Sequence, residues 1–207
     1  MLNYKHKAKR NGYSLVVGVD EAGRGPLAGP VVAAAVAFQD YQFQNKITDS
    51  KKLTASQRER AYLEIEDKAY FGIGVVAESV IDSKNILEAT YDAMNIAITR
   101  LMRRIIRLEQ DQKELTRKTF LLIDGNSFKS DLPYEFEAIV KGDNLSLSIA
   151  CASIIAKVTR DRILMLYDQI LPQYDFRQHK GYPTLEHKRL IQQHGLSFIH
   201  RRTFNYL

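Results

Sequence analysis

The hydrophobic pattern of the chain contains short apolar runs that predict five strands. Leu15 to Val19 is a β-branched run, and Val31 to Phe38 is a continuous run of small and β-branched residues typical of a buried strand. Tyr70 to Ala77 has a similar composition despite two internal glycines. Two shorter runs follow at Phe120 to Ile123 and at Phe136 to Val140.

Between these runs the apolar residues take a helical period. Asn85 to Leu108 carries an apolar stripe with charges on the opposite face, which predicts a long packed helix, and Leu145 to Ile170 predicts a second. Shorter helices are expected at Thr54 to Lys68, after a threonine cap, and at Thr184 to His194, closed by Gly195. The strands and helices together predict an α/β sandwich built on a mixed β-sheet.

Length and composition favour one domain. A chain of 207 residues with 45% hydrophobic residues can bury a substantial core, and no composition shift, repeat or Gly/Ser-rich tract marks a linker. We expect a single domain over residues 1–207, with residues 1–12 as a basic N-terminal tail. The longest apolar runs, such as Pro30 to Phe38, are too short to cross a bilayer. We therefore expect a cytoplasmic monomer without membrane contact.

The charge balance is consistent with a polyanionic partner. A net charge of +6 and a pI near 9.3 suggest one, although ordinary soluble proteins share such values. The single cysteine, Cys151, lies in an apolar run and is expected as a small buried core residue. Basic residues collect in several groups, some of which are expected to be solvated faces: Lys5, Lys7, Lys9 and Arg10; Lys51 and Lys52; Arg103, Arg104 and Arg107; Arg160 and Arg162; Arg201 and Arg202.

Acidic residues follow three of the predicted strands. Asp20 and Glu21 are adjacent, and because neighbouring side chains of a strand point to opposite faces, we expect the first strand to break there. A following Gly/Pro-rich turn would supply the break. Asp124 and Asp143 come after two later strands. Gathering four carboxylates makes sense around hard divalent cations, so the set suits a Mg²⁺ or Mn²⁺ pair about 4 Å apart.

Two other interpretations of these motifs exist. Asp124-Gly125-Asn126 and Gly142-Asp143-Asn144 have the composition of ordinary turns, and spacing alone favours that interpretation. Gly23-Arg24-Gly25 with Gly29 superficially resembles a dinucleotide-binding loop. The fingerprint spacing is not met, however, Pro26 interrupts it, and a strand follows where a helix is required.

The chain resembles the ribonuclease HII family along nearly its whole length. The most specific match is the opening Asp20-Glu21-Ala22-Gly23-Arg24-Gly25-Pro26-Leu27-Ala28-Gly29-Pro30. Further matching segments are Asp49-Ser50-Lys51-Lys52-Leu53, Asn85-Ile86-Leu87, Asp124-Gly125-Asn126, Lys141-Gly142-Asp143, residues 152–162, His179-Lys180-Gly181-Tyr182-Pro183-Thr184 and His200-Arg201-Arg202.

The resemblance implies a ribonuclease-H-like fold, a mixed sheet flanked by helices with a helical C-terminal part from about residue 171. It implies hydrolysis of the RNA strand of RNA–DNA hybrids, and of ribonucleotide-containing duplex DNA, leaving 3′-hydroxyl and 5′-phosphate ends. The implied site residues are Asp20, Glu21, Asp124 and Asp143 for Mn²⁺ or Mg²⁺, Gly23, Arg24, Gly25 and Tyr182 for the ribonucleotide and its junction with DNA, and Ser50, Lys51 and Lys52 for phosphates. The C-terminal segment, about 171–207, is expected to contact the substrate.

Six residues in or near these segments have a further interpretation. Lysine base rates alone also permit a solvated position for Lys51 and Lys52. Asp161 lies between two arginines on a predicted helix and is expected to form an ion pair. His179 and His187 lie in a basic segment and are expected as phosphate contacts or surface residues, without a catalytic role. Asn144 departs from the family pattern, in which a small residue commonly follows Lys-Gly-Asp.

Two rival functions differ in testable ways. Ribonuclease HIII is a sister class expected to carry an additional N-terminal substrate-binding domain, whereas about a dozen residues precede the first predicted strand here. A non-catalytic nucleic-acid-binding module could also keep the same fold, because fold does not guarantee activity. Four intact carboxylates argue against that module.

Overall fold

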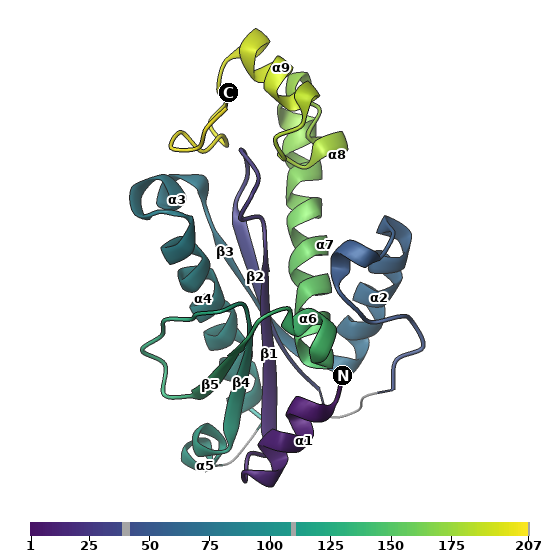
Figure 1. Ribbon diagram of the computed structural model, residues 1–207, viewed down its shortest axis with the longest axis vertical. Coiled ribbons are helices and arrows are strands. Elements are labelled where there is room, and N and C mark those ends of the chain that lie inside the picture. The colour runs from purple at the N-terminus through teal and green to yellow at the C-terminus, as the bar shows by residue number, and fades with distance from the viewer. Residues whose placement is uncertain (39–41, 109–110, 207) are drawn as a thin grey trace.

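A five-stranded mixed sheet forms the centre of the computed structural model, which describes residues 1–38, 42–108 and 111–206. The strand order is β3-β2-β1-β4-β5 (Figure 1). Strands β1 to β3 pair antiparallel, whereas β4 is parallel to both β1 and β5. The strands are β1 (Leu15–Ala22), β2 (Val31–Phe38), β3 (Ala69–Val76), β4 (Thr119–Asp124) and β5 (Glu135–Ile139).

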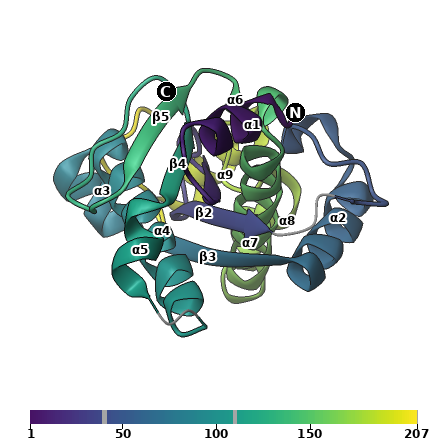
Figure 2. The same ribbon diagram turned by 90° about the horizontal axis from the view of Figure 1, so that it is seen from below.

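Helices cover both faces of this sheet. Figure 2 shows α2 on one side of the strands and α3 and α5 on the other. The α-helices are α1 (Asn3–Arg10), α2 (Ala55–Lys68), α3 (Glu78–Lys84), α4 (Ile86–Ile106), α5 (Gln112–Arg117), α6 (Gly142–Leu145), α7 (Leu147–Ile170), α8 (Phe176–His179) and α9 (Leu185–His194). Two 3₁₀ turns, η1 (Ser50–Lys52) and η2 (Pro172–Tyr174), complete the described part of the chain. These findings confirm the predicted fold class.

Two long helices pack directly against the sheet. Helix α4 packs on one face, around Val17, Val19 and the odd-numbered alanines of β2, and α7 packs on the other. A Cβ atom added to Gly74 of β3 would lie 1.9 Å from the carbonyl oxygen of Ala93 on α4. A Cβ atom on Gly18 of β1 would lie 2.1 Å from the backbone of Ser148 on α7. Glycine inside these strands therefore permits the close approach of helix to sheet.

Residues 1–12 contain a packed helix, so our expectation of a basic tail is incomplete. Helix α1 buries Ala8, and Lys7 Nζ forms an ion pair with Glu137 Oε2 on β5 at 2.9 Å. Ala8 is the one buried residue of α1, so the helix has no wide apolar stripe for a sequence pattern to detect. The helix lies at the end of the molecule opposite the C-terminal segment (Figure 1).

The C-terminal segment, residues 171–206, packs against the second half of α7. Its own apolar cluster includes Leu164 of α7 with Phe176, Leu190 and Ile199. Backbone hydrogen bonds join this segment to the loop after β1: Leu27 N to Gly181 O at 2.7 Å, Gly29 N to Ile199 O at 2.9 Å, and Arg201 N to Leu27 O at 2.8 Å. The C-terminal segment and the loop after β1 are thus held together through their backbones. None of the described helices is both long and apolar enough to span a membrane.

Candidate active site

Asp20 and Glu21 lie within β1, so our expectation that the strand breaks at Asp20 is wrong. The strand continues to Ala22, with Asp20 opposite Ala34 and Glu21 opposite Ala33 on β2. On its other side, β1 pairs with β4 only as far as Val19. Because the sheet is open beyond that point, Glu21 can remain partly exposed while Asp20 is buried. Both carboxylates therefore sit where the sheet opens.

Asp124 and Asp143 come together from the end of β4 and the first turn of α6. Asp124 is the last residue of β4, as expected, whereas β5 ends at Ile139 and Asp143 belongs to α6 rather than to a strand end. Lys141, whose backbone is left-handed with φ +57°, turns the chain between the end of β5 and the start of α6. Gly142 N donates a hydrogen bond of 2.6 Å to Asp124 Oδ1, which ties α6 to the end of β4.

The four carboxylates repel one another. Burial, followed by the charges of Glu21 and Asp124, raises the pKa of Asp20 well above its usual range. Burial also raises the pKa of Glu21, although Arg24, whose guanidinium lies 3.6 Å from the Glu21 carboxylate, opposes the shift. Asp124 and Asp143 have pKa values raised mainly by burial. Such mutual effects require the carboxylates to be close neighbours.

Asp49 is a fifth carboxylate at this site, and the sequence analysis assigned it no role. It precedes η1, accepts a hydrogen bond from Lys51 N at 2.9 Å, and lies next to the carboxyl group of Asp143. Its charge raises the pKa of both Asp124 and Asp143. The one available signal was its place at the head of the Asp49-Ser50-Lys51-Lys52 motif. Asp49 therefore joins η1 to the acidic cluster.

The donor set fits a hard divalent cation in its chemistry. All five groups offer carboxylate oxygen, which Mg²⁺ and Mn²⁺ prefer, and their repulsion would be relieved by positive charge. In residues 1–38, 42–108 and 111–206, no group of three or more Asp, Glu, His or Cys side chains is already arranged to hold a metal ion. Protein donors hold several carboxylates: Glu21 N donates to Asp20 Oδ1 at 2.7 Å, and Asn144 Nδ2 donates to Asp143 Oδ1 at 2.7 Å.

Ser50 lies behind the acidic cluster, not at its surface. It was expected to contact phosphate, but its side chain is buried and its hydroxyl accepts a 2.9 Å hydrogen bond from Ser153 of α7. The side chain of Ser153 also lies beside Asp20. Ser50 therefore packs behind the site, next to a residue that contacts a site carboxylate, and is not open to a phosphate.

Lys51 and Lys52 are exposed at the rim of the cluster. The positive charge of Lys51 lowers the pKa of both Glu21 and Asp124, which places this lysine near the acids. Lys52 Nζ hydrogen bonds with Asn144 Oδ1 on α6. The residue that departs from the family pattern thus fixes one of the two lysines.

Two buried arginines shape the loop that contains Gly23, Arg24 and Gly25. Both belong to the groups of basic residues noted in the sequence, and both are fully buried. Arg201 donates to the carbonyl oxygens of Gly23 at 2.5 Å, Gly29 at 2.7 and 2.9 Å, and Arg24 at 3.1 Å. Arg160 donates to those of Pro30, Ala28 and Lys180 at 2.9 to 3.0 Å. The loop therefore turns its carbonyl groups inward, while Arg24 and Gly25 remain exposed.

Tyr182 lies against the exposed part of this loop. Its side chain is 37% exposed, and a Cβ atom built on Gly25 would lie 3.9 Å from Tyr182 Cε1. Lys157 Nζ lies 5.5 Å from the ring centroid. Lys157 also pairs with Asp161 at 2.7 Å, which confirms Asp161 as an ion-pair residue, although its partner is not one of the flanking arginines. Tyr182 and Gly25 thus share one accessible surface.

The surface position expected for His179 and His187 is wrong, because both are buried. They pack with a third buried histidine, His200, behind Tyr182. Each lies within an apolar cluster around Phe176 that no local pattern indicates. Cys151, in contrast, is buried as predicted, and burial raises the pKa of its thiol beyond the usual range.

The comparisons with known proteins agree on one family. The family model described as Ribonuclease HII matches residues 17–206. Ribonuclease HII of Syntrophus aciditrophicus is 48% identical over 205 residues, covering 99% of this chain and 90% of that protein. The crystal structure of ribonuclease H2 from Pyrococcus horikoshii superposes with a TM-score of 0.66 at 26% identity, covering 93% of this chain and 94% of the other.

A more distant structure shares the fold alone. Bst-RNase HIII in complex with Mn²⁺ superposes with a TM-score of 0.66 at 16% identity, covering 96% of this chain and 70% of that one. The family model and the relative at 48% identity, by contrast, both carry the ribonuclease HII description. The chain therefore belongs to the ribonuclease HII family.

Proposed function

We propose that this protein hydrolyses the RNA strand of RNA–DNA hybrids and also cuts on the 5′ side of a single ribonucleotide in duplex DNA. Membership of the ribonuclease HII family carries the general activity, that of a ribonuclease H endonuclease. The observation that supports the specific proposal is the position of the acidic cluster on β1, immediately before the exposed surface of Gly25 and Tyr182. One surface thus combines phosphodiester chemistry with ribose recognition.

Asp20, Glu21, Asp124 and Asp143 are proposed to hold two divalent cations. Each carboxylate has about four acceptor sites, so the hydrogen bonds described above leave lone pairs for a cation. When bound, a pair of Mg²⁺ or Mn²⁺ ions activates a water and stabilises the leaving oxygen, giving 3′-hydroxyl and 5′-phosphate ends. The residues themselves need supply no nucleophile. Their role is to fix the cations beside the scissile phosphate.

Recognition of the ribose is assigned to the loop of Gly23, Arg24 and Gly25. The two buried arginines hold its carbonyl groups inward, so its exposed backbone has a fixed shape. Gly25 has no side chain to keep a sugar at a distance, and the 2′-hydroxyl is the group that separates RNA from DNA. We propose that this backbone contacts the 2′-hydroxyl directly.

Lys51 and Lys52 are proposed to contact phosphates without reading sequence. Replacing both by alanine should weaken binding to every hybrid sequence and reduce the slope of log affinity against log salt by about 1 to 2, because each phosphate contact contributes about 0.9. Equilibrium binding in EDTA across a range of salt concentrations measures this slope. A matched control is Lys113→Ala with Lys118→Ala. These lysines lie in and just after α5, where β4 begins, whereas Asp20 lies toward the other end of the neighbouring β1. An unchanged slope in the Lys51/Lys52 variant would remove these lysines from the interface.

Tyr182 is proposed to pack its ring on the sugar at the RNA–DNA junction. Tyr182→Phe keeps the aromatic face and should retain most cleavage, whereas Tyr182→Ala should reduce cleavage at a lone ribonucleotide more than cleavage of a long hybrid. On the long hybrid, other contacts can still set the register. Single-turnover rates on the two substrates provide the comparison, with Phe198→Ala, an exposed aromatic of the same segment, as the control. Equal losses on both substrates would reduce Tyr182 to a general positioning role.

One assay tests the whole proposal. The protein is incubated with a DNA duplex that contains one ribonucleotide, with an all-DNA duplex and with a long hybrid, in Mg²⁺ and in Mn²⁺ separately. Cleavage on the 5′ side of the ribonucleotide, with a product end that a ligase can use, is the expected result. Cleavage of the long hybrid alone would restrict the function to hybrid processing. Binding without cleavage in either metal would indicate a nucleic-acid-binding module.

A further inference from the structure

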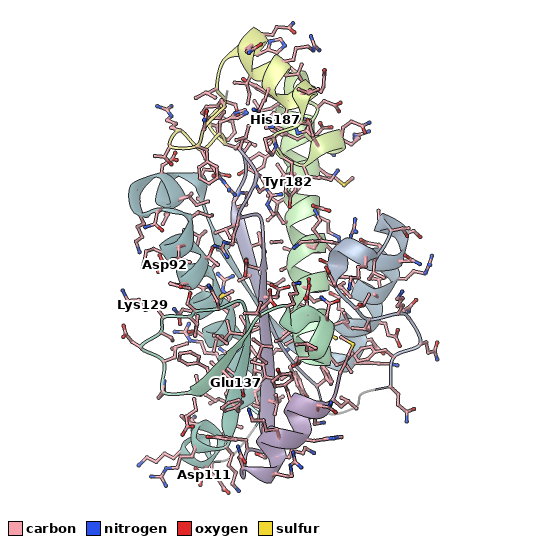
Figure 3. All side chains as sticks on the ribbon, viewed as in Figure 1. Asp92, Asp111, Lys129, Glu137, Tyr182 and His187 are labelled. Atoms are coloured by element: carbon pink, nitrogen blue, oxygen red, sulfur yellow. The ribbon has the colours of Figure 1, made fainter. Side chains whose placement is uncertain are left out.

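Three histidines of the C-terminal segment are buried together behind Tyr182. The side chains of His179, His187 and His200 are 8%, 0% and 2% exposed. The rings of His179 and His187 stack with centroids 4.1 Å apart, and the ring of His200 lies 5.3 Å from that of His187. Figure 3 shows His187 and Tyr182 at the end of the molecule that this segment forms. The proposed function uses none of these imidazoles.

The hydrogen bonds of His187 and His200 have a defined direction. A carbonyl oxygen can only accept, so His187 Nδ1 donates to Tyr182 O at 2.9 Å. Nε2 of the neutral ring is then an acceptor, and His200 Nε2 must donate to it across 3.1 Å. This leaves His200 Nδ1 to accept from the backbone N–H of Ser197 at 2.9 Å and from its hydroxyl at 2.7 Å. The result is a chain of hydrogen bonds, here called the relay, that runs from Ser197 through His200 and His187 to the carbonyl oxygen of Tyr182.

The peptide unit between Lys180 and Gly181, just before Tyr182, is held by the third histidine. His179 Nε2 donates to Tyr174 O at 2.8 Å, and its Nδ1 accepts from Gly181 N at 3.1 Å. Gly181 has φ +80°, and a Cβ atom there would lie 2.5 Å from the carbonyl oxygen of Ala28. The backbone that carries Tyr182 is therefore fixed both to buried imidazoles and to the loop after β1.

From this geometry we infer that His187, supported by His200, is a positioning residue that holds the Tyr182 ring against Gly25 for recognition of a ribonucleotide. The inference rests on the role proposed above for Tyr182. Pro183 restricts the backbone of the preceding Tyr182, whose carbonyl oxygen also accepts a hydrogen bond from Thr184 N at 2.8 Å within the turn. His187 Nδ1 gives the same oxygen a second donor, which ties this turn to helix α9.

The relay requires neutral rings, and the surroundings keep them neutral. If His187 Nε2 were protonated, it and His200 Nε2 would both be donors and could no longer hydrogen bond to each other. Burial lowers the pKa of both His187 and His200 to about 4, with neighbouring histidines adding to the effect. At neutral pH the direction of the relay is thus maintained. The other titratable groups that face the three rings are Tyr174, Asp175, Lys180, Glu186 and Tyr206.

The first test compares the ratio of two single-turnover rates, on a lone-ribonucleotide duplex and on a long hybrid. His187→Phe removes the donor and should lower this ratio about ten-fold, the effect of one buried hydrogen bond. His187→Asn places an amide donor near the position of Nδ1 and should keep the ratio within about three-fold. His194→Phe, at an exposed position of the same helix, is the matched control.

A double-mutant cycle shows whether His187 acts through Tyr182. In a Tyr182→Ala background, His187→Phe should no longer change the ratio, because the positioned ring is already absent. Equal slowing of both substrates by His187→Phe would mean that the histidine only supports folding, and an undiminished effect in the Tyr182→Ala background would place its action elsewhere. Either result overturns the inference.

An independent measurement does not depend on cleavage at all. The chain contains no tryptophan, so Tyr182→Trp introduces a single fluorescent ring. Its nanosecond anisotropy should show a fixed ring, and His187→Phe, but not His187→Asn, should lower the residual anisotropy. If the protein failed to cut at a lone ribonucleotide yet showed this dependence, the proposed function would fail and the positioning role would stand. A ring equally fixed in the presence and absence of the His187 donor would refute the positioning role.

Discussion

Replacement of a single site carboxylate by its amide, as in Asp20→Asn, Glu21→Gln or Asp124→Asn, is expected to lower turnover by roughly a hundred-fold or more. The same holds for Asp143→Asn. Each change removes one negative charge from the set proposed to hold the cations, and charge stabilisation of the reacting phosphate is usually the largest single contribution to such catalysis. Single-turnover cleavage at saturating enzyme, in Mg²⁺ and in Mn²⁺, measures the effect.

The stability of the same variants should change in the opposite direction. In the metal-free protein, burial raises the pKa of Asp20 above its unfolded value, so the folded state is favoured at acid pH and loses stability as the pH rises through the folded pKa. Asp20→Asn removes that loss. Its free energy of unfolding in EDTA should exceed that of the unmodified protein at pH 7, and the difference should shrink as the pH falls to about 4.

Asp161→Asn serves as the control for both measurements. Asp161 lies in a matched motif and carries the same charge, but it pairs with Lys157 within α7, where both side chains are largely buried. It should therefore retain full chemistry and should not show the gain in free energy of unfolding that is expected for Asp20→Asn. Near-normal turnover of Asp143→Asn, or a loss in Asp161→Asn as large as in Asp124→Asn, would show that the site has been assigned to the wrong carboxylates.

The sequence predicted the main strands and long helices well because these elements depend on local patterns. A buried strand such as β2 is a continuous apolar run, and α4 has a clear apolar stripe, so their bounds differ from expectation by two residues at most. Thr54 was expected to cap α2, and it forms a capping box with Gln57. In each case the signal and the structure lie in the same stretch of chain.

What the sequence failed to predict depends on contacts between distant segments. Strand β1 continues through Asp20 because it stays paired with β2, and the sheet opens beside its carboxylates because the pairing with β4, about a hundred residues later, ends at Val19. Asp49 reaches the acidic cluster only because η1 packs beside α7 and α6. A basic residue in a basic segment is normally exposed, so the burial of Arg201 could not be read from composition. Its partners are carbonyl groups 172 to 178 residues away.

Loss of Arg201 is expected to have the second large effect, this time on stability. Arg201→Met keeps much of the volume but removes the hydrogen bonds that the guanidinium donates to the carbonyl groups of Gly23, Arg24 and Gly29. Removing one partner from a buried charged network commonly costs about 3 to 5 kcal/mol. We expect a loss of that size in urea unfolding at pH 7 in EDTA, with the slope against urea unchanged.

Two further variants separate the role of the guanidinium from that of its charge. Arg201→Lys restores the positive charge but has one nitrogen in place of a planar fork, so it cannot reach carbonyl groups on two sides of the loop and should recover less than half of the loss. Arg202→Met, at the exposed neighbouring position, should change the free energy of unfolding by less than about 0.5 kcal/mol. Full recovery by Arg201→Lys would mean that charge, not the fork, holds the loop. A loss below about 1 kcal/mol in Arg201→Met would mean that these carbonyl groups find other donors, and the fixed shape proposed for the Gly23–Gly25 loop would then lose its physical basis.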